Sequence, residues 1–190
     1  MSSESVKEVV RPAGARDRIL DVAGPLFWRE GFRAVGVDRV IAEAGVAKAT
    51  FYKHFPAKDD LILAWLDRAE AMSEGYAPSE EGPQPLTDYA LAMVRLARGP
   101  ACLGCTWQGT AAEFHDLDHP AHAAALATKR RVLAALERRA VNEGLAEPKA
   151  AAERVFLFLE GVWASARMFG SGAPLDQAEE AVRRLVGTAG

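Results

Sequence analysis

The chain has 190 residues, of which 49% are hydrophobic and 26% are charged, and its formal net charge is −3. This length suits one mid-sized domain or a small domain joined to a larger one, and the hydrophobic content excludes wholesale disorder. Two cysteines exclude a disulfide scaffold, and no apolar run approaches the ~18 residues of a membrane span, so we expect a cytoplasmic protein without membrane contact.

Abundant alanine and sparse β-branched residues predict an all-α fold of about nine helices. Residues 1–14 are expected to form a flexible tail. Apolar residues at helical spacing, ended by Gly or Pro, then predict helices over 15–30, 37–44, 48–55, 58–73, 86–98, 105–114, 120–142, 148–169 and 175–186. Gly24-Pro25 is expected to kink or break the first helix, because proline has no N–H to donate. The Pro- and Gly-rich segment 75–85 is predicted to be a loop.

The charge is unevenly distributed along the chain. Residues 1–58 contain 10 Lys and Arg against 7 Asp and Glu, a balance of +3, whereas residues 59–190 contain 13 against 19, a balance of −6. A basic segment on an acidic body is expected when only that segment meets phosphate. We therefore divide the chain into a DNA-binding domain over 1–58 and a larger domain over 59–190.

The segment 37–55 has the pattern of a helix-turn-helix: a short helix, a turn at Gly45 and a second short helix. Apolar residues pack between these two helices, and Phe51 and Phe55 belong to the core. Five polar residues of the second helix are expected to face outward and to suit a major groove: Lys48, Thr50, Tyr52, Lys53 and His54. For Tyr52 and His54, a half-buried packing role against the fourth helix is an equally good interpretation.

The run Ala-Gly-Val-x-x-x-Thr-Phe-Tyr-x-His-Phe-x-x-Lys over 44–58 resembles the DNA-binding head of TetR-family transcriptional regulators. The resemblance covers about residues 16–66 and implies a homodimer whose first three helices bind operator DNA. It implies that Thr50 and Tyr52 occupy DNA-contact positions, with the Tyr52 hydroxyl on a phosphate, and that His54 and Lys58 contact the backbone. Lys48 and Lys53 are added as contacts because of their charge and expected exposure.

The chain departs from the family pattern at two helix starts. Gly36 and Ala47 stand where family members often carry the Ser or Thr that caps a helix. Neither residue has a hydroxyl to offer to a phosphate, so we expect a weaker DNA affinity or one that depends more on the lysines.

The resemblance also implies that the remaining helices hold a small-molecule pocket and the dimer interface, and that ligand releases a repressor from its operator. The helix over 149–169 is apolar nearly all round in its segment 155–163, which requires burial on every side. The helix over 175–186 carries an apolar stripe of Leu175, Ala178, Val182, Leu185 and Val186. We expect these two helices to pack on those of a second copy as a four-helix interface, the alternative being an ordinary monomer core.

Aromatic and sulfur-containing residues of the larger domain are candidates to line the pocket: Trp65, Met93, Trp107, Phe114 and Trp163. Such walls suit an apolar or aromatic effector, although each residue alone is explained equally well as core. The sequence leaves open whether the regulator represses or activates.

Cys102 and Cys105 form a Cys-x-x-Cys, and three histidines follow at 115, 119 and 122. The alternative function is therefore a metal- or thiol-responsive regulator, although two cysteines are only half of a zinc site. We predict no resident metal or cofactor. No catalytic motif is present, and Glu113 and Glu160 have no partner apparent in the sequence, so we expect no enzyme activity.

Overall fold

The computed structural model describes residues 14–74, 84–100 and 102–187, and in these ranges it contains helices and no strand. This confirms the all-α prediction. The predicted tail and most of the predicted loop over 75–85 lie outside the described residues. The helices are α1 (Ala15–Glu30), α2 (Val37–Ala44), α3 (Lys48–His54), α4 (Lys58–Glu74), α5 (Leu86–Ala97), α6 (Thr106–Glu113), α7 (Pro120–Glu143), α8 (Pro148–Phe169), the 3-10 helix η1 (Gly170–Gly172) and α9 (Ala178–Gly187).

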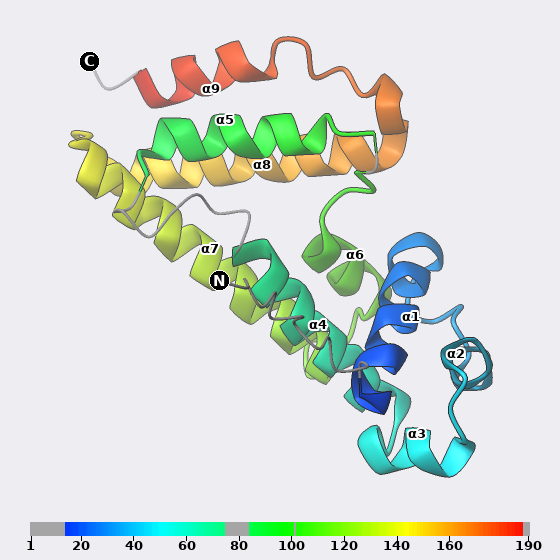
Figure 1. The fold of residues 1–190 in the computed structure, drawn as a ribbon. Coiled ribbons are helices and arrows are strands. Elements are labelled where there is room, and N and C mark those ends of the chain that lie inside the picture. Colours follow the sequence, from blue (N-terminus) through cyan, green and yellow to red (C-terminus); the bar gives the residue numbers. More distant parts are fainter. Residues whose placement is uncertain (1–13, 75–83, 101, 188–190) are drawn as a thin grey trace, which may run out of the picture.

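Helices α1, α2 and α3 form a head at one end of the molecule, and α5, α8 and α9 lie side by side at the other end (Figure 1). Helix α7 runs diagonally between the two ends, and α4 packs against it. Helix α6 lies between the head and the α5–α8 layer. Every path between the two ends therefore passes through α4, α6 or α7.

The buried residues form two clusters rather than one. The first cluster joins the head to α4, α6 and the start of α7, and its largest fully buried side chains include Phe51, Phe55 and Leu61. The second cluster lies among α5, α8, α9 and the end of α7. The head therefore shares its core with α4, α6 and α7, so a displacement of these helices also repacks the head.

Helix α1 continues unbroken through Gly24-Pro25. Pro25 lies on the exposed side of α1, where solvent can reach the Asp21 carbonyl that has lost its N–H partner. Gly24 faces inward, and a Cβ placed on it would come within 2.4 Å of the Trp65 indole nitrogen. The glycine that weakens the helix locally therefore allows α4 to approach α1 closely.

The apolar stripe of α9 is covered by its own chain, with Val182 and Val186 only 0% and 5% exposed. Helices α5 and α8 pack against it, and Leu175 is buried from the turn before α9, which begins three residues later than predicted. This corrects our expectation that the stripe faces a second copy. Leu157 and Met168 on α8 are 70% and 77% exposed in the single chain, so burial of α8 on every side would require a second copy.

Candidate nucleic-acid interface and ligand cavity

The turn between α2 and α3 fixes the presentation of α3. Gly45 adopts a left-handed conformation (φ 61°), and its amide and that of Val46 return to carbonyls in the last turn of α2. Phe51 is fully buried beneath α3, while Ile41 and Val46 pack against the same core. The outer side of α3 is therefore held rigidly toward solvent.

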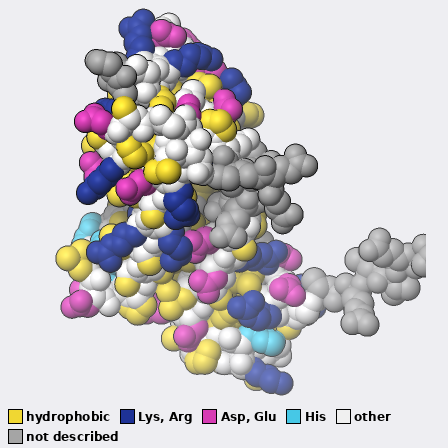
Figure 2. All heavy atoms as spheres, turned by 90° about the vertical axis from the view of Figure 1, so that its left-hand side faces the viewer, with side chains coloured by type: hydrophobic (Ala, Val, Ile, Leu, Met, Phe, Trp, Pro, Cys, Tyr) yellow, Lys and Arg dark blue, Asp and Glu magenta, His cyan; other side chains and the backbone are white. Residues whose placement is uncertain are grey.

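The structure places the candidate DNA-contact residues on one exposed end of the molecule. Lys48, Tyr52 and Lys53 are exposed, whereas Thr50 and His54 are half-buried. The Tyr52 ring is 42% exposed and stands edge-on to Phe51, which leaves its hydroxyl outside the core. Figure 2 shows Lys, Arg and His side chains together at the lower end of that view, the end at which the head lies.

Lys48 is paired with an acid across the turn. Its ammonium donates to the Asp38 carboxylate at 3.1 Å, and both side chains are largely exposed. This hydrogen bond raises the pKa of Lys48. The Asp38 carboxylate thus lies beside a cation that the sequence predicts to contact phosphate.

Neither Gly36 nor Ala47 provides a side-chain cap to the helix that follows it.

Lys58 opens α4 and is half-buried. Its ammonium donates to the Arg33 carbonyl at 3.3 Å, and burial lowers its pKa. The amide of Ala57, at the start of α4, already donates to Asp60 at 2.8 Å. Lys58 consequently supports the loop between α1 and α2 as well as carrying a charge near the head surface.

Glu113, at the end of α6, binds the head directly. Its carboxylate accepts hydrogen bonds from the amides of Phe32 (3.1 Å) and Arg33 (2.9 Å) in the loop between α1 and α2. Gly31 has a positive φ of 85°, and a Cβ there would lie 2.6 Å from a Glu113 oxygen. The sequence showed Glu113 without a partner because these partners are backbone amides some eighty residues away.

Four aromatic rings join the head to the rest of the chain. Phe32 contacts Trp65 and Phe114 at ring-centroid distances of 5.6 and 5.8 Å, and Phe27 contacts Trp65 at 6.0 Å. Phe114 also stacks on His119 at 4.3 Å. Trp65 and Phe114, expected to line a pocket, therefore belong to this joint.

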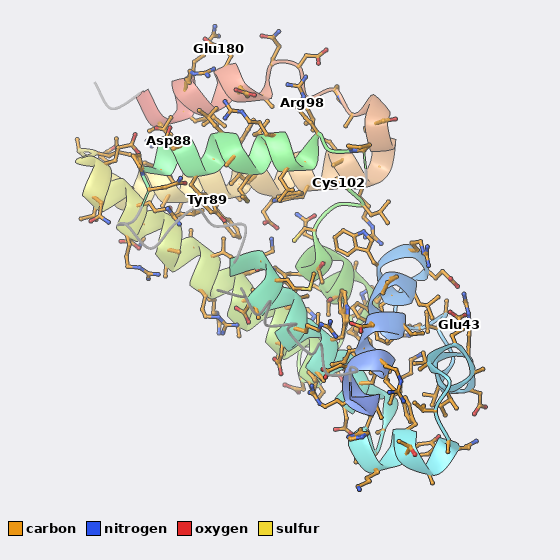
Figure 3. The ribbon with its side chains drawn as sticks, viewed as in Figure 1. Glu43, Asp88, Tyr89, Arg98, Cys102 and Glu180 are labelled. Carbon is orange, nitrogen blue, oxygen red and sulfur yellow. The ribbon has the colours of Figure 1, made fainter. Side chains whose placement is uncertain are left out.

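A cavity of about 470 Å³ lies among helices α4 to α8, with one wall from α1. Met93, Trp107 and Trp163 line it, whereas Trp65 and Phe114 do not. The full lining is Trp28, Ala69, Ser73, Tyr89, Met93, Leu96, Gly99, Pro100, Cys102, Gly104, Cys105, Thr106, Trp107, Lys129, Val132, Leu136, Phe156, Leu159, Glu160 and Trp163. Tyr89 comes from α5 and Cys102 from the turn after it (Figure 3).

One ion pair faces this mainly apolar cavity. Lys129 on α7 donates to Glu160 on α8, and their side chains are 17% and 27% exposed. Gln108 on α6 donates to the Glu160 carboxylate at 2.8 Å and to its backbone carbonyl at 2.9 Å. Sequence reasoning missed this network because its three residues lie on three different helices.

The phenol of Tyr89 is also part of the cavity wall. Burial raises its pKa, so the ring carries its proton at neutral pH. The Arg139 guanidinium lies 4.5 Å from the ring centroid, on a face of the ring. The hydroxyl has no hydrogen-bond partner among the residues that the structure describes.

Both cysteines are free thiols in the cavity wall. The Cys102 sulfur accepts from the Gly104 amide at 3.4 Å. Two of the three histidines that follow the cysteines make other contacts: His119 caps α7 by accepting from the Ala121 amide, and His122 contacts the Phe114 carbonyl at 2.7 Å. Across the described ranges, no three His, Cys, Asp or Glu side chains are grouped so as to hold a metal ion.

Comparisons with known proteins identify relatives of this arrangement. The family model described as bacterial regulatory proteins, tetR family, matches residues 19–65. The crystal structure of SCO4454, a TetR-family transcriptional regulator from Streptomyces coelicolor, superimposes with a TM-score of 0.84 at 30% identity, covering 92% of this chain and 95% of that chain. This likeness therefore extends over most of the chain.

Curated relatives match over shorter stretches of the chain. The HTH-type transcriptional repressor KstR of Rhodococcus jostii is 31% identical over 98 residues, 52% of this chain and 43% of that protein. The HTH-type transcriptional activator FasR of Mycolicibacterium smegmatis is 40% identical over 53 residues, 28% of this chain and 24% of that protein. The chain thus spans less than half the length of these two relatives.

Within the described residues, no helix is long and apolar enough to cross a membrane.

Proposed function

The chain belongs to the TetR family of DNA-binding transcriptional regulators, which are not enzymes, and from this premise we propose that it is a homodimeric repressor that a small apolar or aromatic molecule releases from its operator. The single observation that carries the proposal is the double attachment of α6. One end of this helix lines the cavity, and the other end is hydrogen-bonded to the head.

The DNA-binding surface in this proposal is the outer side of α3 with the start of α4. The contacts are Lys48, Thr50, Tyr52, Lys53, His54 and Lys58, as the sequence predicts. The exposure of Lys48, Tyr52 and Lys53 supports this assignment, because the other side of the same helix is fully buried at Phe51. The positive charge meets phosphate, so operator affinity is expected to fall as salt rises.

The dimer in this proposal forms through the exposed side of α8, with α9 beside it. Leu157, Gly161, Ala164 and Met168 recur at helical spacing on that side and are exposed in the single chain. Small residues between two large apolar ones allow a second α8 to approach closely. Two heads then read two half-sites, separated by one or more turns of roughly 34–36 Å.

Helix α6 links the state of the cavity to the position of the head. Trp107 lines the cavity, Gln108 binds Glu160 in its wall, and Glu113 binds the head loop. All three lie on one helix of eight residues, which moves as a rigid unit. A ligand that displaces Trp107 or Gln108 shifts Glu113, and the spacing of the two heads changes with it. Release from the operator requires only that the ligand binds more tightly to the conformation with the changed head spacing than to the DNA-binding conformation.

Repression is favoured over activation by the more extensive of the two curated matches. KstR, a repressor, aligns over 52% of this chain, and FasR, an activator, aligns over 28%. A reporter gene placed behind the operator tests the sign. We expect the protein to lower reporter output, and raised output would support activation.

The ligand response is tested on the purified dimer. An operator is first isolated by selection from random duplexes, and aromatic compounds are then screened by quenching of tryptophan fluorescence, since Trp28, Trp107 and Trp163 line the cavity. Compounds that quench are expected to release the operator in fluorescence anisotropy. Compounds that fill the cavity and leave operator affinity unchanged would contradict the proposal.

A thiol-responsive regulator remains the second candidate, because Cys102 and Cys105 both line the cavity. The Cys102→Ser/Cys105→Ser variant separates the two candidates. A variant that is regulated like the parent protein removes the thiol mechanism, and a variant that no longer responds supports it.

A further inference from the structure

The charged and polar groups of the cavity differ in how fully their hydrogen bonds are used. The Glu160 carboxylate accepts from Lys129 with one oxygen and from Gln108 with the other. The Gln108 amide nitrogen already donates to both the carboxylate and the carbonyl of Glu160. Each Glu160 oxygen therefore already has one donor, and the Gln108 amide nitrogen already makes two hydrogen bonds.

Two donors in the cavity wall, the Lys129 ammonium and the Tyr89 hydroxyl, have hydrogen-bonding capacity left. An ammonium has three N–H groups, and in the described chain that of Lys129 has the Glu160 carboxylate as its one hydrogen-bond partner. The Tyr89 hydroxyl is a second donor without a partner there. Lys129 from α7 and Tyr89 from α5 both line the cavity.

The net charge of the cavity selects among ligands that carry an acceptor. Lys129 and Glu160 neutralise one another within a wall of indole, phenyl and aliphatic groups. A carboxylate or an ammonium on the ligand would add an uncompensated charge to this apolar space, which is costly. An uncharged oxygen acceptor uses the free donors and leaves the ion pair intact. The rings of Trp28, Trp107 and Trp163 favour a flat partner.

We propose that the effector is an uncharged aromatic molecule bearing a carbonyl oxygen, which accepts hydrogen bonds from Lys129 and Tyr89. This inference rests on the proposed function, because it assumes that the cavity is the effector site. It narrows the apolar or aromatic class to aryl ketones and similar carbonyl compounds. It also assigns the recognition of the carbonyl to one residue of α5 and one of α7.

Four naphthalenes of similar size test the proposal: 2-acetylnaphthalene, 2-ethylnaphthalene, 2-naphthoate and 2-naphthylmethylammonium. Binding to the 190-residue protein is followed by quenching of tryptophan fluorescence. We expect the ketone to bind about tenfold or more tightly than the hydrocarbon, because a hydrogen bond to a charged donor is among the stronger ones. Both charged probes should bind more weakly than the ketone.

Two variants locate the donor. Lys129→Met/Glu160→Gln removes the ammonium while keeping the cavity neutral, and should lower the affinity for the ketone to that for the hydrocarbon. Tyr89→Phe should weaken ketone binding by about two- to tenfold and leave the hydrocarbon unaffected. Thermal melting checks that both variants are folded. If the double variant does not fold, the ketone affinity of Tyr89→Phe alone decides the test.

Equal binding of ketone and hydrocarbon would overturn the proposal, as would tighter binding of either charged probe or unchanged ketone affinity in the variants. Failure of all four probes to bind would also overturn it. The proposed function fails separately, through operator anisotropy. If a different compound fills the cavity and releases the operator, the ligand response stands and the carbonyl inference does not.

Discussion

The Glu113 carboxylate accepts a 2.9 Å hydrogen bond from the amide of Arg33, which joins the end of α6 to the loop that precedes α2. A second bond, from the Phe32 amide, completes a two-point attachment of a body helix to the head. Helix α6, which lines the cavity, is thus connected to the head by these two hydrogen bonds in addition to apolar packing.

Glu113→Ala is expected to lower the free energy of unfolding by about 1–3 kcal/mol, because two backbone amides lose their acceptor. It should also reduce ligand-induced operator release, since α6 no longer holds the head. Thermal melting and anisotropy measure the two effects. Glu137→Ala, on an exposed side of α7, is the matched control. If ligand releases the operator from Glu113→Ala as fully as from the control variant, coupling through the Glu113 contact is excluded.

Gly24→Ala tests the close approach of α1 and α4. The added Cβ meets the Trp65 indole at 2.4 Å, so the buried ring must move. Overpacking of this kind costs about 1–3 kcal/mol and opposes the gain in helix propensity. Gly172→Ala, with no atom within 4 Å of the new Cβ, is the control. A melting temperature for Gly24→Ala at or above that of the parent would show that the joint is more plastic than its geometry indicates.

Asp38→Asn is expected to tighten operator binding by about two- to fivefold, an effect of the size seen for surface ion pairs. The substitution removes a carboxylate beside the proposed DNA contact Lys48 and frees that cation for phosphate. Lys48→Ala should weaken binding and reduce the salt dependence by about one ion. If Asp38→Asn tightens binding equally in the Lys48→Ala background, the gain does not pass through Lys48.

Operator affinity should also depend on pH through Lys58. Burial lowers the pKa of this residue, so its charge is lost at a lower pH than that of an ordinary lysine. The pKa of Lys48 is raised, so Lys48 stays charged over the same range. Affinity is therefore expected to fall as the pH rises from neutrality toward the ordinary lysine pKa of about 10.4. Lys58→Arg should flatten this profile, and an identical decline in the variant would assign it to other groups.

The sequence predicted those features of the fold that depend on local pattern. Helix periodicity and Gly or Pro breaks predicted all nine α-helices of the described ranges within a few residues, and the short motif over 44–58 predicted the head. The predicted start of α9 was wrong because Leu175 lies before the helix but is buried, and periodicity cannot distinguish such a residue from one in the helix.

The parts that sequence reasoning missed depend on distant pairings. Glu113 meets backbone amides of the head, and the Lys129–Glu160–Gln108 network combines three helices. Trp65 and Phe114 have the residue type of a pocket wall, but they pack against Phe32 in the joint. Residue type predicted apolar packing correctly, and only tertiary contacts show which of two apolar clusters each ring joins.

Native mass spectrometry of the protein with its selected operator duplex tests most directly that two heads act together on DNA. We expect one duplex to carry chains in multiples of two, and the selected sequences to contain an inverted repeat whose half-sites are one or more helical turns apart. Tyr52→Phe should lower the bound fraction and leave the free protein dimeric. One chain per duplex, or selected sequences without a repeat, would contradict the dimeric two-site mechanism.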